Sequence, residues 1–406
     1  MQLIHPFAGL RPAPEHAAEV AAPPYDVLSS AEARERAAGK RWSFLHISKP
    51  EIDLPADTDP FAPQVYAKAA ENLRGMIAHG VLRRDARPCF YVYRLRTASH
   101  TQIGLALTAA VADYDSNRIR RHEYTRPDKE DDRVRQIEAL DAQTGPVLLA
   151  YPDAPEVDDI LGRWTQRPPA TDVEADGGVR HAIWVVDDAP AIATLTRAFD
   201  AMPVLYIADG HHRSAAASRV AAARRGQASA QRFLAVAFAH HQMRILDYNR
   251  LVRDLHGMTA AQFLARIGQA FSVEQAGGAV RPAGPGEFGL YLAGAWHRLR
   301  IRADLARSDD PVRCLDVSLL ADHLLEPVLG IVDPRTDRRI DFVGGGRGLG
   351  ELERRVDSGE MAAAFSLHPT RMRDLMAVAD AGRVMPPKST WFEPKLADGL
   401  VSHVLD

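Results

Sequence analysis

Five consecutive residues near the middle of the chain combine side chains that can do chemistry: Asp209, Gly210, His211, His212 and Arg213. Glycine lets a backbone approach an anion closely, and an arginine guanidinium can donate two hydrogen bonds to one phosphate group. Histidine adds donors that titrate near neutral pH. A phosphate repels the carboxylate of Asp209, which fits better as a helix N-cap, a base or a Mg²⁺ ligand.

The elements around this pentapeptide must position it so that its side chains and backbone can contact a ligand. Residues 204–208 are apolar and predict a strand, the Asp-Gly pair predicts a turn, and residues 211–225 predict a helix. A helix N-terminus directs unpaired backbone N–H groups and a partial positive charge at the preceding turn. The pattern therefore predicts a phosphate-binding turn. Spacing alone leaves a capped helix with surface histidines open as the alternative.

A stiff segment near the N-terminus presents a second carboxylate. Two consecutive prolines at 23 and 24 fix φ and extend the residues before them, so Tyr25 and Asp26 follow on a rigid chain. Asp26 is a candidate catalytic residue, and Tyr25 is a candidate contact to a substrate. The alternative is that Asp26 only caps the helix predicted to begin near residue 30.

Residues 119–133 carry a dense run of charges. Pro127 suits the first turn of a helix, and the acidic residues after it suit the helix dipole. Glu123 is the second candidate for a catalytic carboxylate. Four further side chains could neutralise phosphate or bind a substrate carboxylate: Arg121, His122, Lys129 and Arg133. The alternative is a solvated face with ion pairs between residues four apart.

Two later segments add candidate contacts to a substrate. Asn249 and Arg250 belong to the sequence Asp-Tyr-Asn-Arg, for which ordinary turn residues are the alternative. Lys388 lies in a proline-stiffened tail that could fold back over the site and bring a cation to a phosphate. Alternatively, Trp391 and Phe392 only dock the C-terminus onto the core.

Spacing along the chain assigns no metal ligands. His240 and His241 form a second histidine pair besides His211 and His212. Adjacent residues at the end of a strand point to opposite faces, so at most one histidine of each pair could join a common site.

Composition limits the kinds of protein that this chain can be. It has 406 residues and a net charge of −3, which predicts two or three domains and argues against a basic face that coats nucleic acid. No apolar run approaches ~18 residues, and the N-terminus does not have the pattern of a signal peptide, so we expect no membrane span. Cys89 and Cys314 lie in no metal-binding spacing, which favours a reduced, cytoplasmic compartment.

Strands and helices alternate without a strict βαβ rhythm, which predicts a mixed α/β (α+β) fold with a partly antiparallel sheet. The composition changes near residue 257, and residues 277–286 are rich in glycine and proline. We therefore expect one domain over residues 1–256, which contains the pentapeptide, and an additional C-terminal α/β domain over residues 257–406.

Several of these motifs resemble known families. Residues 208–217 are similar to the signature box of the ParB/sulfiredoxin superfamily, in which a Gly-x-x-Arg turn before a helix holds nucleotide phosphates. The Asp-Gly-His-His-Arg form resembles the free L-serine kinases of the ParB-like group, which make O-phosphoserine. The chain as a whole resembles a family called domain of unknown function 1015. The stretches that match it are 23–27, 121–125, 129–133, 208–213, 247–250 and 385–390.

The resemblance implies a ParB/sulfiredoxin-like mixed sheet core and a nucleotide-binding catalytic domain at residues 1–256. It implies a kinase that uses ATP or ADP with Mg²⁺ to phosphorylate free serine or a similar small molecule. Gly210, His211, His212 and Arg213 would hold the phosphates, and Asp209, Glu123 or Asp26 would help to hold the metal. Asp26 or Glu123 would accept the hydroxyl proton, although the serine kinases carry Glu where this chain has Asp26.

Other members of the superfamily supply the alternatives. A ParB-like nucleotide switch or DNA-associated module without kinase activity is the main one, and the net charge of −3 and the lack of a helix-turn-helix pattern count against it. A sulfiredoxin-type reductase is excluded because His211 stands where the catalytic cysteine would be. A homodimer stays open as an assembly.

Overall fold

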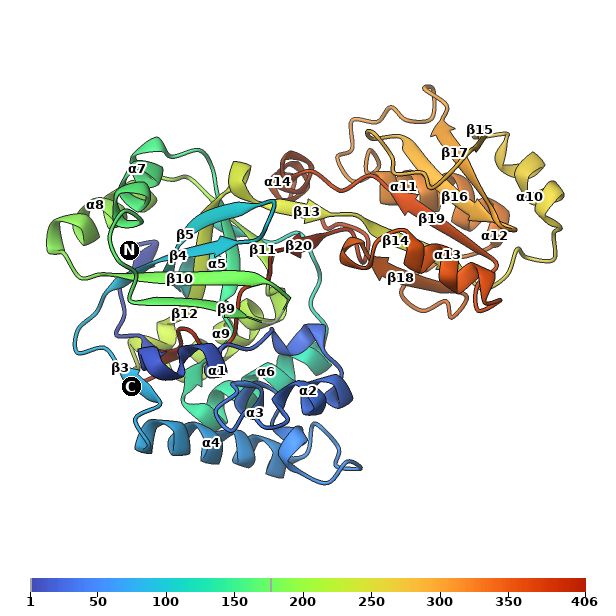
Figure 1. Ribbon diagram of the computed structural model, residues 1–406. Helices are drawn as coiled ribbons and strands as arrows, with labels where there is room; N and C mark the ends of the chain where they lie inside the picture. The colour runs from blue at the N-terminus through green and yellow to red at the C-terminus, as the bar shows by residue number, and fades with distance from the viewer. Residues whose placement is uncertain (1, 176) are drawn as a thin grey trace. The chain divides into compact units, whose positions relative to one another are not determined.

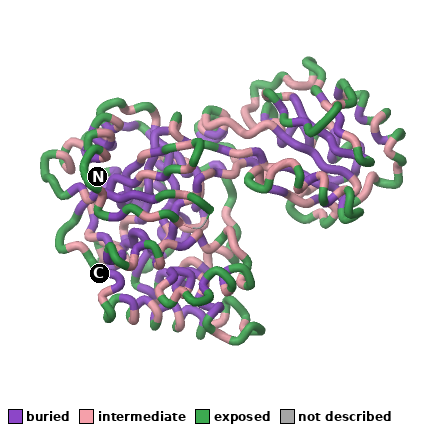
Figure 2. Tube along the Cα trace, viewed as in Figure 1, coloured by how far each residue is buried: buried purple, intermediate pink, exposed green. Residues whose placement is uncertain are grey.

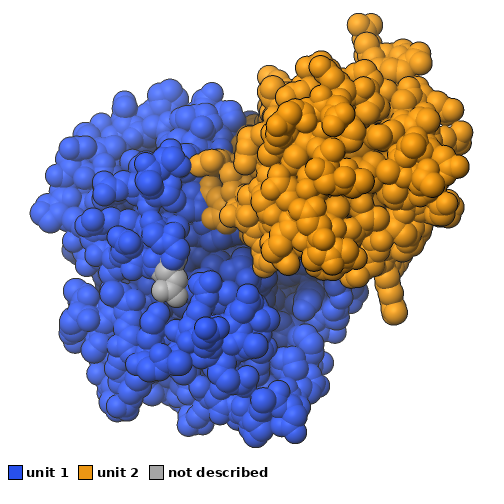
Figure 3. Space-filling model, turned by 45° about the vertical axis from the view of Figure 1, so that its right-hand side comes forward, with its two compact units in different colours: residues 1–243, 394–406 blue, residues 244–393 orange. Residues whose placement is uncertain are grey.

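A computed structural model describes residues 2–175 and 177–406 of the chain (Figure 1). The chain divides into two compact units, coloured separately in Figure 3: unit 1 comprises residues 1–243 and 394–406, and unit 2 comprises residues 244–393. The sequence places the domain boundary after residue 256, whereas this division falls after residue 243. The last residues of the chain return to unit 1, so unit 2 is an insertion within it.

A large mixed sheet forms the centre of unit 1. Its strands follow the order β6 (Ile119–Arg120), β11 (Leu205–Asp209), β8 (Val147–Tyr151), β12 (Arg232–Ala239), β5 (Thr101–Ala110), β4 (Phe90–Arg96), β10 (Val179–Val186) and β9 (Thr171–Ala175), with β1 (Ile4–His5) paired to β5. The pairs β6–β11 and β8–β12 are parallel. The other pairs are antiparallel. The predicted mixed α/β fold is therefore confirmed.

Strands β5 and β12 pack very closely at one point of this sheet. Gly104 of β5 is opposite Phe238 of β12. A Cβ atom on Gly104 would lie 2.5 Å from the carbonyl oxygen of Ala237 and 2.7 Å from the Phe238 ring. A residue without a side chain is thus required at Gly104. Buried residues concentrate along these strands, as Figure 2 shows.

Three helices of unit 1 pack in succession beside the sheet (Figure 1): α9 (His211–Ala223) contacts α6 (Pro127–Leu140), and α6 contacts α4 (Pro63–Ala78). Helix α6 begins at Pro127, as predicted. Unit 1 also contains α1 (Ala17–Val20), α2 (Ser30–Ala37), α3 (Leu45–Ser48), α5 (Val111–Asp115), α7 (Pro155–Trp164) and α8 (Ala189–Asp200). In the part of the chain that the structure describes, no helix has the length and apolar character needed to cross a membrane.

The residues at the start of α2 show whether Asp26 caps this helix, which was the alternative to a catalytic role. The hydroxyl of Ser29 accepts a hydrogen bond from the backbone N–H of Glu32, and the Glu32 carboxylate accepts one from the backbone N–H of Ser29. This reciprocal pair is a capping box. Ser29 therefore caps the helix, and the interpretation of Asp26 as its cap is wrong.

The C-terminal segment passes back through unit 1. Strand β21 (His403–Val404) pairs with β7 (Ala142–Gln143), and the backbones of Asp398 and Ala22 exchange two hydrogen bonds. A further small sheet pairs β2 (Leu10–Pro12) with β3 (Leu82–Arg84). The segment after residue 393 is thus built into unit 1 rather than trailing from it.

Unit 2 is built on an antiparallel sheet. Its strand order is β15 (Phe271–Ala276), β17 (Ala295–Ile301), β16 (Glu287–Leu292), β19 (Ala363–Leu367), β14 (Tyr248–Val252) and β18 (Ile340–Gly344). Strand β13 (Arg244–Leu246) pairs with β20 (Trp391–Glu393), so the chain enters and leaves this unit on neighbouring strands. The helices are α10 (Ala260–Ile267), α11 (Asp316–Leu320), α12 (Glu326–Leu329), α13 (Gly350–Asp357) and α14 (Met372–Asp380).

Candidate functional site

The predicted strand, turn and helix around residues 209–213, called the box below, are all present. Strand β11 ends at Asp209, and α9 begins at His211 with Gly210 as its N-cap. Gly210 has a φ of +95°, a conformation that glycine adopts without strain. No side chain among the described residues caps this helix. The backbone N–H groups of its first turn therefore do not have to be shared with a capping oxygen.

Arg213 is a largely buried cation whose donors are not all used. Its Nη1 donates a hydrogen bond to the carbonyl oxygen of Pro146. Its Nη2 lies 3.7 Å from the carboxylate of Asp26 and 3.9 Å from that of Asp209, distances that allow attraction but exceed a hydrogen bond. Its buried Nε has no hydrogen-bond partner among the described residues. Burial alone would lower the pKa of Arg213, but these two carboxylates raise it, so the side chain stays charged.

Asp209 is held as a carboxylate by a lysine from the far end of the chain. Lys395 Nζ lies 3.2 Å from one carboxylate oxygen of Asp209, and the backbone N–H of Gly210 donates to the other at 2.9 Å. Burial alone would raise the pKa of Asp209, but Lys395 and Arg213 outweigh burial and hold that pKa below its usual range. A carboxylate with so low a pKa is a weak general base.

The two histidines of the box lie against the loop between β6 and α6. The rings of His211 and His122 meet edge-on, with their centroids 4.5 Å apart. The backbone N–H of Arg126 donates to His212 Nε2 at 3.1 Å, and His211 Nδ1 lies 3.9 Å from a carboxylate oxygen of Glu123. Burial lowers the pKa of His122 to about 4 and the pKa of His211 well below its usual value. Both rings are therefore neutral at pH 7.

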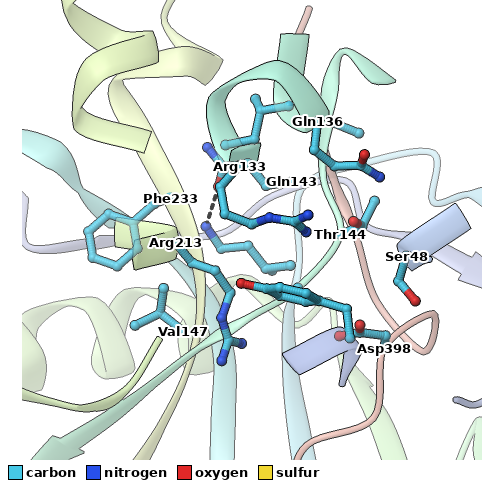
Figure 4. Close-up of a pocket in the computed structure, with 14 residues that line it drawn as sticks. Ser48, Arg133, Gln136, Gln143, Thr144, Val147, Arg213, Phe233 and Asp398 are labelled. Carbon is cyan, nitrogen blue, oxygen red and sulfur yellow. Dashed lines mark hydrogen bonds between the residues drawn. The ribbon is translucent and has the colours of Figure 1, made fainter. Parts of the chain in front are cut away.

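One side of the box is closed by residues that approach Arg213 from three segments. The Arg133 guanidinium stacks on the ring of Tyr25, at 3.8 Å from its centroid. Asp398 is 2% exposed, and burial raises its pKa to about 7. Arg133, Arg213 and Asp398 converge on a cavity of about 30 Å³ (Figure 4). That volume admits water but not a nucleotide, so a larger ligand must approach the box elsewhere.

Asp26 and Glu123 are the accessible carboxylates beside the box, with side chains that are 40% and 50% exposed. Arg121 and Lys129, also predicted as contacts to substrate, turn their charges to aromatic rings instead. Arg121 lies over the ring of Tyr114, and Lys129 lies over that of Phe61. Neither of these contacts is with the box.

The remaining predicted contacts lie in unit 2. Asn249 is fully buried, and both polar atoms of its amide form hydrogen bonds within the unit. Arg250 is 3% exposed, burial lowers its pKa to about 10, and it donates to the backbone carbonyls of Tyr248 and Pro387. Lys388 Nζ lies 5.6 Å from the centroid of the Tyr248 ring. These are contacts of residues that hold unit 2 together, and their role toward a substrate stays a prediction.

The second histidine pair does not share a cluster with the box. His241 Nδ1 lies 2.8 Å and His240 Nδ1 lies 3.5 Å from the same carboxylate oxygen of Asp153. His211 is instead grouped with His122 and Glu123. The two histidine pairs of the sequence thus belong to separate clusters.

Sequence reasoning missed two residues of the site, Lys395 and Asp398. The ion pair of Lys395 with Asp209 joins positions 186 residues apart, and no local pattern announces it. Asp398 precedes Gly399, which has a φ of +90°, so an Asp-Gly turn signal was present in the sequence. That signal predicts a turn, but it does not say which segment the turn packs against.

Comparisons with solved structures show remote similarity. A free serine kinase in complex with AMP has 13% identity and a TM-score of 0.36, over 71% of this chain and 86% of that chain. A conserved hypothetical protein from Pyrococcus furiosus has 14% identity and a TM-score of 0.36, over 75% of this chain and 96% of that chain. SbnI with a C-terminal truncation, from Staphylococcus aureus, has 11% identity and a TM-score of 0.38, over 72% and 85%.

Among curated proteins, no sequence matches this chain. A family model described as "Protein of unknown function (DUF1015)" matches residues 4–318. The match covers most of the chain and includes the box, the loop between β6 and α6, and the segment around Asp26. The resemblance seen in the sequence is therefore confirmed, and the chain belongs to the DUF1015 family.

Proposed function

We propose that the chain is a nucleotide-dependent small-molecule kinase, with the box as its phosphate-binding element and free serine as the leading acceptor. The observation that carries this proposal is the state of Arg213. Its buried Nε has no partner among the described residues, and its two carboxylate neighbours lie at 3.7 and 3.9 Å. Buried donors without acceptors are rare in folded proteins. Phosphate oxygens are acceptors that fit a guanidinium well.

The backbone of the box supports the same ligand. Helix α9 starts at a glycine with positive φ and has no side-chain cap among the described residues, so its first turn can donate N–H groups to an anion. Gly145 lies on the other side of Arg213, where a Cβ atom would come within 3.3 Å of the arginine Cδ. The arginine is therefore confined between two glycines, Gly145 and Gly210, and its guanidinium has little freedom to turn away from the helix terminus.

The carboxylates around the turn differ in their surroundings, which separates their roles. Asp209 is neutralised by Lys395 and has a depressed pKa, so we assign it to positioning of the box rather than to proton transfer. Asp26 is accessible and lies 3.7 Å from the guanidinium that would hold the phosphates. We assign Asp26 as the base that accepts the acceptor's hydroxyl proton, with Glu123 as the second candidate.

The donor would be ATP or ADP with Mg²⁺, which neutralises phosphate charge when bound. An accessible carboxylate such as Asp26 or Glu123 suits a hard, oxygen-preferring cation. Free serine as the acceptor is supported by the resemblance of the box to that of the serine kinases. Its carboxylate would need a cation. Among the predicted cations Arg133 lines the same cavity as Arg213, but to reach a serine carboxylate it would have to leave its ion pair with Asp132 and the water-sized cavity would have to open.

The test measures nucleotide binding and phosphoryl transfer on one set of variants. Purified protein with Mg²⁺ and ATP or ADP is incubated with a panel of free amino acids, and O-phosphoserine is detected by mass spectrometry. We expect Arg213→Ala to weaken nucleotide binding about 100-fold, the loss expected for two charge-assisted hydrogen bonds. Arg219→Ala is the matched control, because Arg219 lies on the same helix, is 45% exposed and pairs with Asp131.

The outcomes separate the proposal from its alternative. Transfer to serine that is lost in Arg213→Ala and kept in Arg219→Ala supports the kinase. Nucleotide binding that depends on Arg213, without transfer to any acceptor, supports a nucleotide-binding switch. If the wild-type protein binds neither nucleotide, or if Arg213→Ala binds as well as the wild type, the assignment of the box as a phosphate site is wrong.

A further inference from the structure

Two separate segments of unit 1 bring two imidazoles and a carboxylate together. His122 and Glu123 follow β6, and His211 is the first residue of α9. One potential ligand atom from each of the three side chains lies within 4.8 Å of the other two. The two segments are fixed relative to each other because β6 and β11 are neighbouring parallel strands of one sheet.

His122 is the unusual member of this group. It is 1% exposed, and neither of its ring nitrogens makes a hydrogen bond of normal geometry within residues 2–175 and 177–406; its backbone contact with Ile207 is looser than that. A buried polar side chain almost always has a partner, and a neutral imidazole has a lone pair on one nitrogen that can bind a metal ion. His211 is nearly as buried, and among the residues that the structure describes its Nε2 has only a long contact of 3.5 Å with the backbone N–H of His122. Two buried histidines are thus poorly satisfied at the same place.

We propose that His122, Glu123 and His211 form a binding site for a divalent transition-metal ion such as Zn²⁺. Two imidazole nitrogens with one carboxylate oxygen suit zinc or iron, whereas Mg²⁺ and Ca²⁺ prefer all-oxygen ligands. Three protein ligands leave at least one coordination position for water or another ligand, which is the arrangement of catalytic rather than structural zinc sites. Glu123 is half-exposed, so an ion can enter from solvent on its side.

Metal binding requires the three side chains to move closer together. Ligand atoms that lie about 2.0–2.1 Å from a tetrahedral zinc ion are about 3.3–3.4 Å apart. His211 Nδ1 and the nearer oxygen of Glu123, at 3.9 Å, must therefore approach each other by about 0.5 Å. The widest gap in the group is no more than 4.8 Å, so it must close by about 1.5 Å or less. A metal on His211 Nδ1 shifts the ring proton to Nε2, and the same movement must carry the backbone N–H of His122 away from it.

This site extends the chemistry beyond the proposed phosphate-binding function and does not depend on it. His211 belongs to both, since it is the first residue of the helix whose N-terminus would hold phosphates. Metal binding can nevertheless be measured without any nucleotide. The second cluster, formed by Asp153, His240 and His241, serves as an internal comparison because its residues are more exposed and its histidines already face a carboxylate.

The experiment determines zinc content and affinity in the whole chain. Metal-free protein is titrated with Zn²⁺ against a chromophoric chelator, and bound zinc is counted by mass spectrometry after gel filtration. Four proteins are compared with the wild type: Glu123→Gln, His122→Ala, a double variant His240→Ala with His241→Ala, and Arg213→Ala. Glu123→Gln changes a half-exposed side chain, so it tests the site even if His122→Ala fails to fold.

We expect Glu123→Gln and His122→Ala to weaken binding of one zinc ion by at least about 100-fold, since loss of a supporting group outside the ligand set already costs about 10–100-fold. The double variant and Arg213→Ala should keep that ion. Wild-type affinity in Glu123→Gln, or loss of the only bound zinc in the double variant, overturns the site. If Arg213→Ala loses nucleotide binding but keeps zinc, the two functions are separable. If the wild-type protein binds zinc but no nucleotide, only the kinase proposal is refuted.

Discussion

Replacement of Asp398 by asparagine should make unit 1 progressively more stable than the wild type as the pH rises toward neutrality. Burial raises the pKa of this carboxyl from about 3.8 to about 7, and Arg213, Asp26 and Arg133 are the charged groups that act on it. In the unfolded chain the same carboxyl ionises near its ordinary pKa. Between these two values the unfolded state has lost a proton that the folded state still holds.

The sign and size of the effect follow from this difference in bound protons. The contribution of Asp398 to the free energy of unfolding is at its full value below pH ~4. It falls by about 1.4 kcal/mol per pH unit as the pH rises from ~4 to ~7. The total is about 4 kcal/mol. Asparagine has nearly the same shape and does not ionise. The difference in free energy of unfolding between variant and wild type should thus grow by about 3 kcal/mol between pH 5 and pH 8 and then level off.

Native-state hydrogen exchange at several pH values is the appropriate assay, because it reports on unit 1 separately from unit 2. The slowest amides of β5 and β12 give the free energy of opening in each protein. Asp57→Asn, at an exposed aspartate of the same unit, is the control and should show no such slope. A difference that does not change with pH would refute the reasoning. It would mean that Arg213 keeps Asp398 ionised in the folded state despite its burial.

Three further substitutions test the packing around the site, each by urea unfolding of the variant and the wild type. Lys395→Met should cost about 1–2 kcal/mol at pH 7, because Asp209 would lose its nearer cation and keep Arg213 as a counter-charge at 3.9 Å. Gly210→Ala should cost about 1–2 kcal/mol and weaken nucleotide binding, since alanine is strained at a φ of +95° and its Cβ would lie 3.0 Å from Arg213 Nε. Gly104→Ala should cost about 3 kcal/mol or more, because its Cβ would lie 2.5 Å from a backbone oxygen. If any of these three variants is as stable as the wild type, the contact on which its prediction rests is contradicted.

Local patterns in the sequence predicted the local structure of the box well. An apolar run, an Asp-Gly pair and an alanine-rich stretch predicted a strand, a turn and a helix, and the structure has β11, Gly210 and α9 at these places. Pro127 likewise marked the start of α6. These features depend on residues within a few positions of one another, and their physical causes are local: backbone propensity, capping and proline geometry.

Features that depend on distant residues were beyond the sequence. Lys395 reaches Asp209 only because the C-terminal segment returns to unit 1, and Asp398 lines the cavity beside Arg213 for the same reason. The charged run predicted contacts to phosphate or to a substrate, but Arg133 is largely covered, paired with Asp132 and stacked on Tyr25. Neither a charge pattern nor a turn signal identifies a partner that another segment supplies, since that choice is made by tertiary packing.

The return of the last residues to unit 1 has a consequence for how the protein is made. The ribosome synthesises residues 1–243 well before Lys395 and Asp398, because the whole of unit 2 lies between Met243 and Lys395 in the chain. During that interval Asp209 lacks its lysine and Arg213 lacks one wall of its cavity. A message that ends before residue 395, or a protease that removes residues 394–406, would therefore yield a product whose box is incomplete. Completion of the box thus has to wait until the whole of unit 2 has been synthesised.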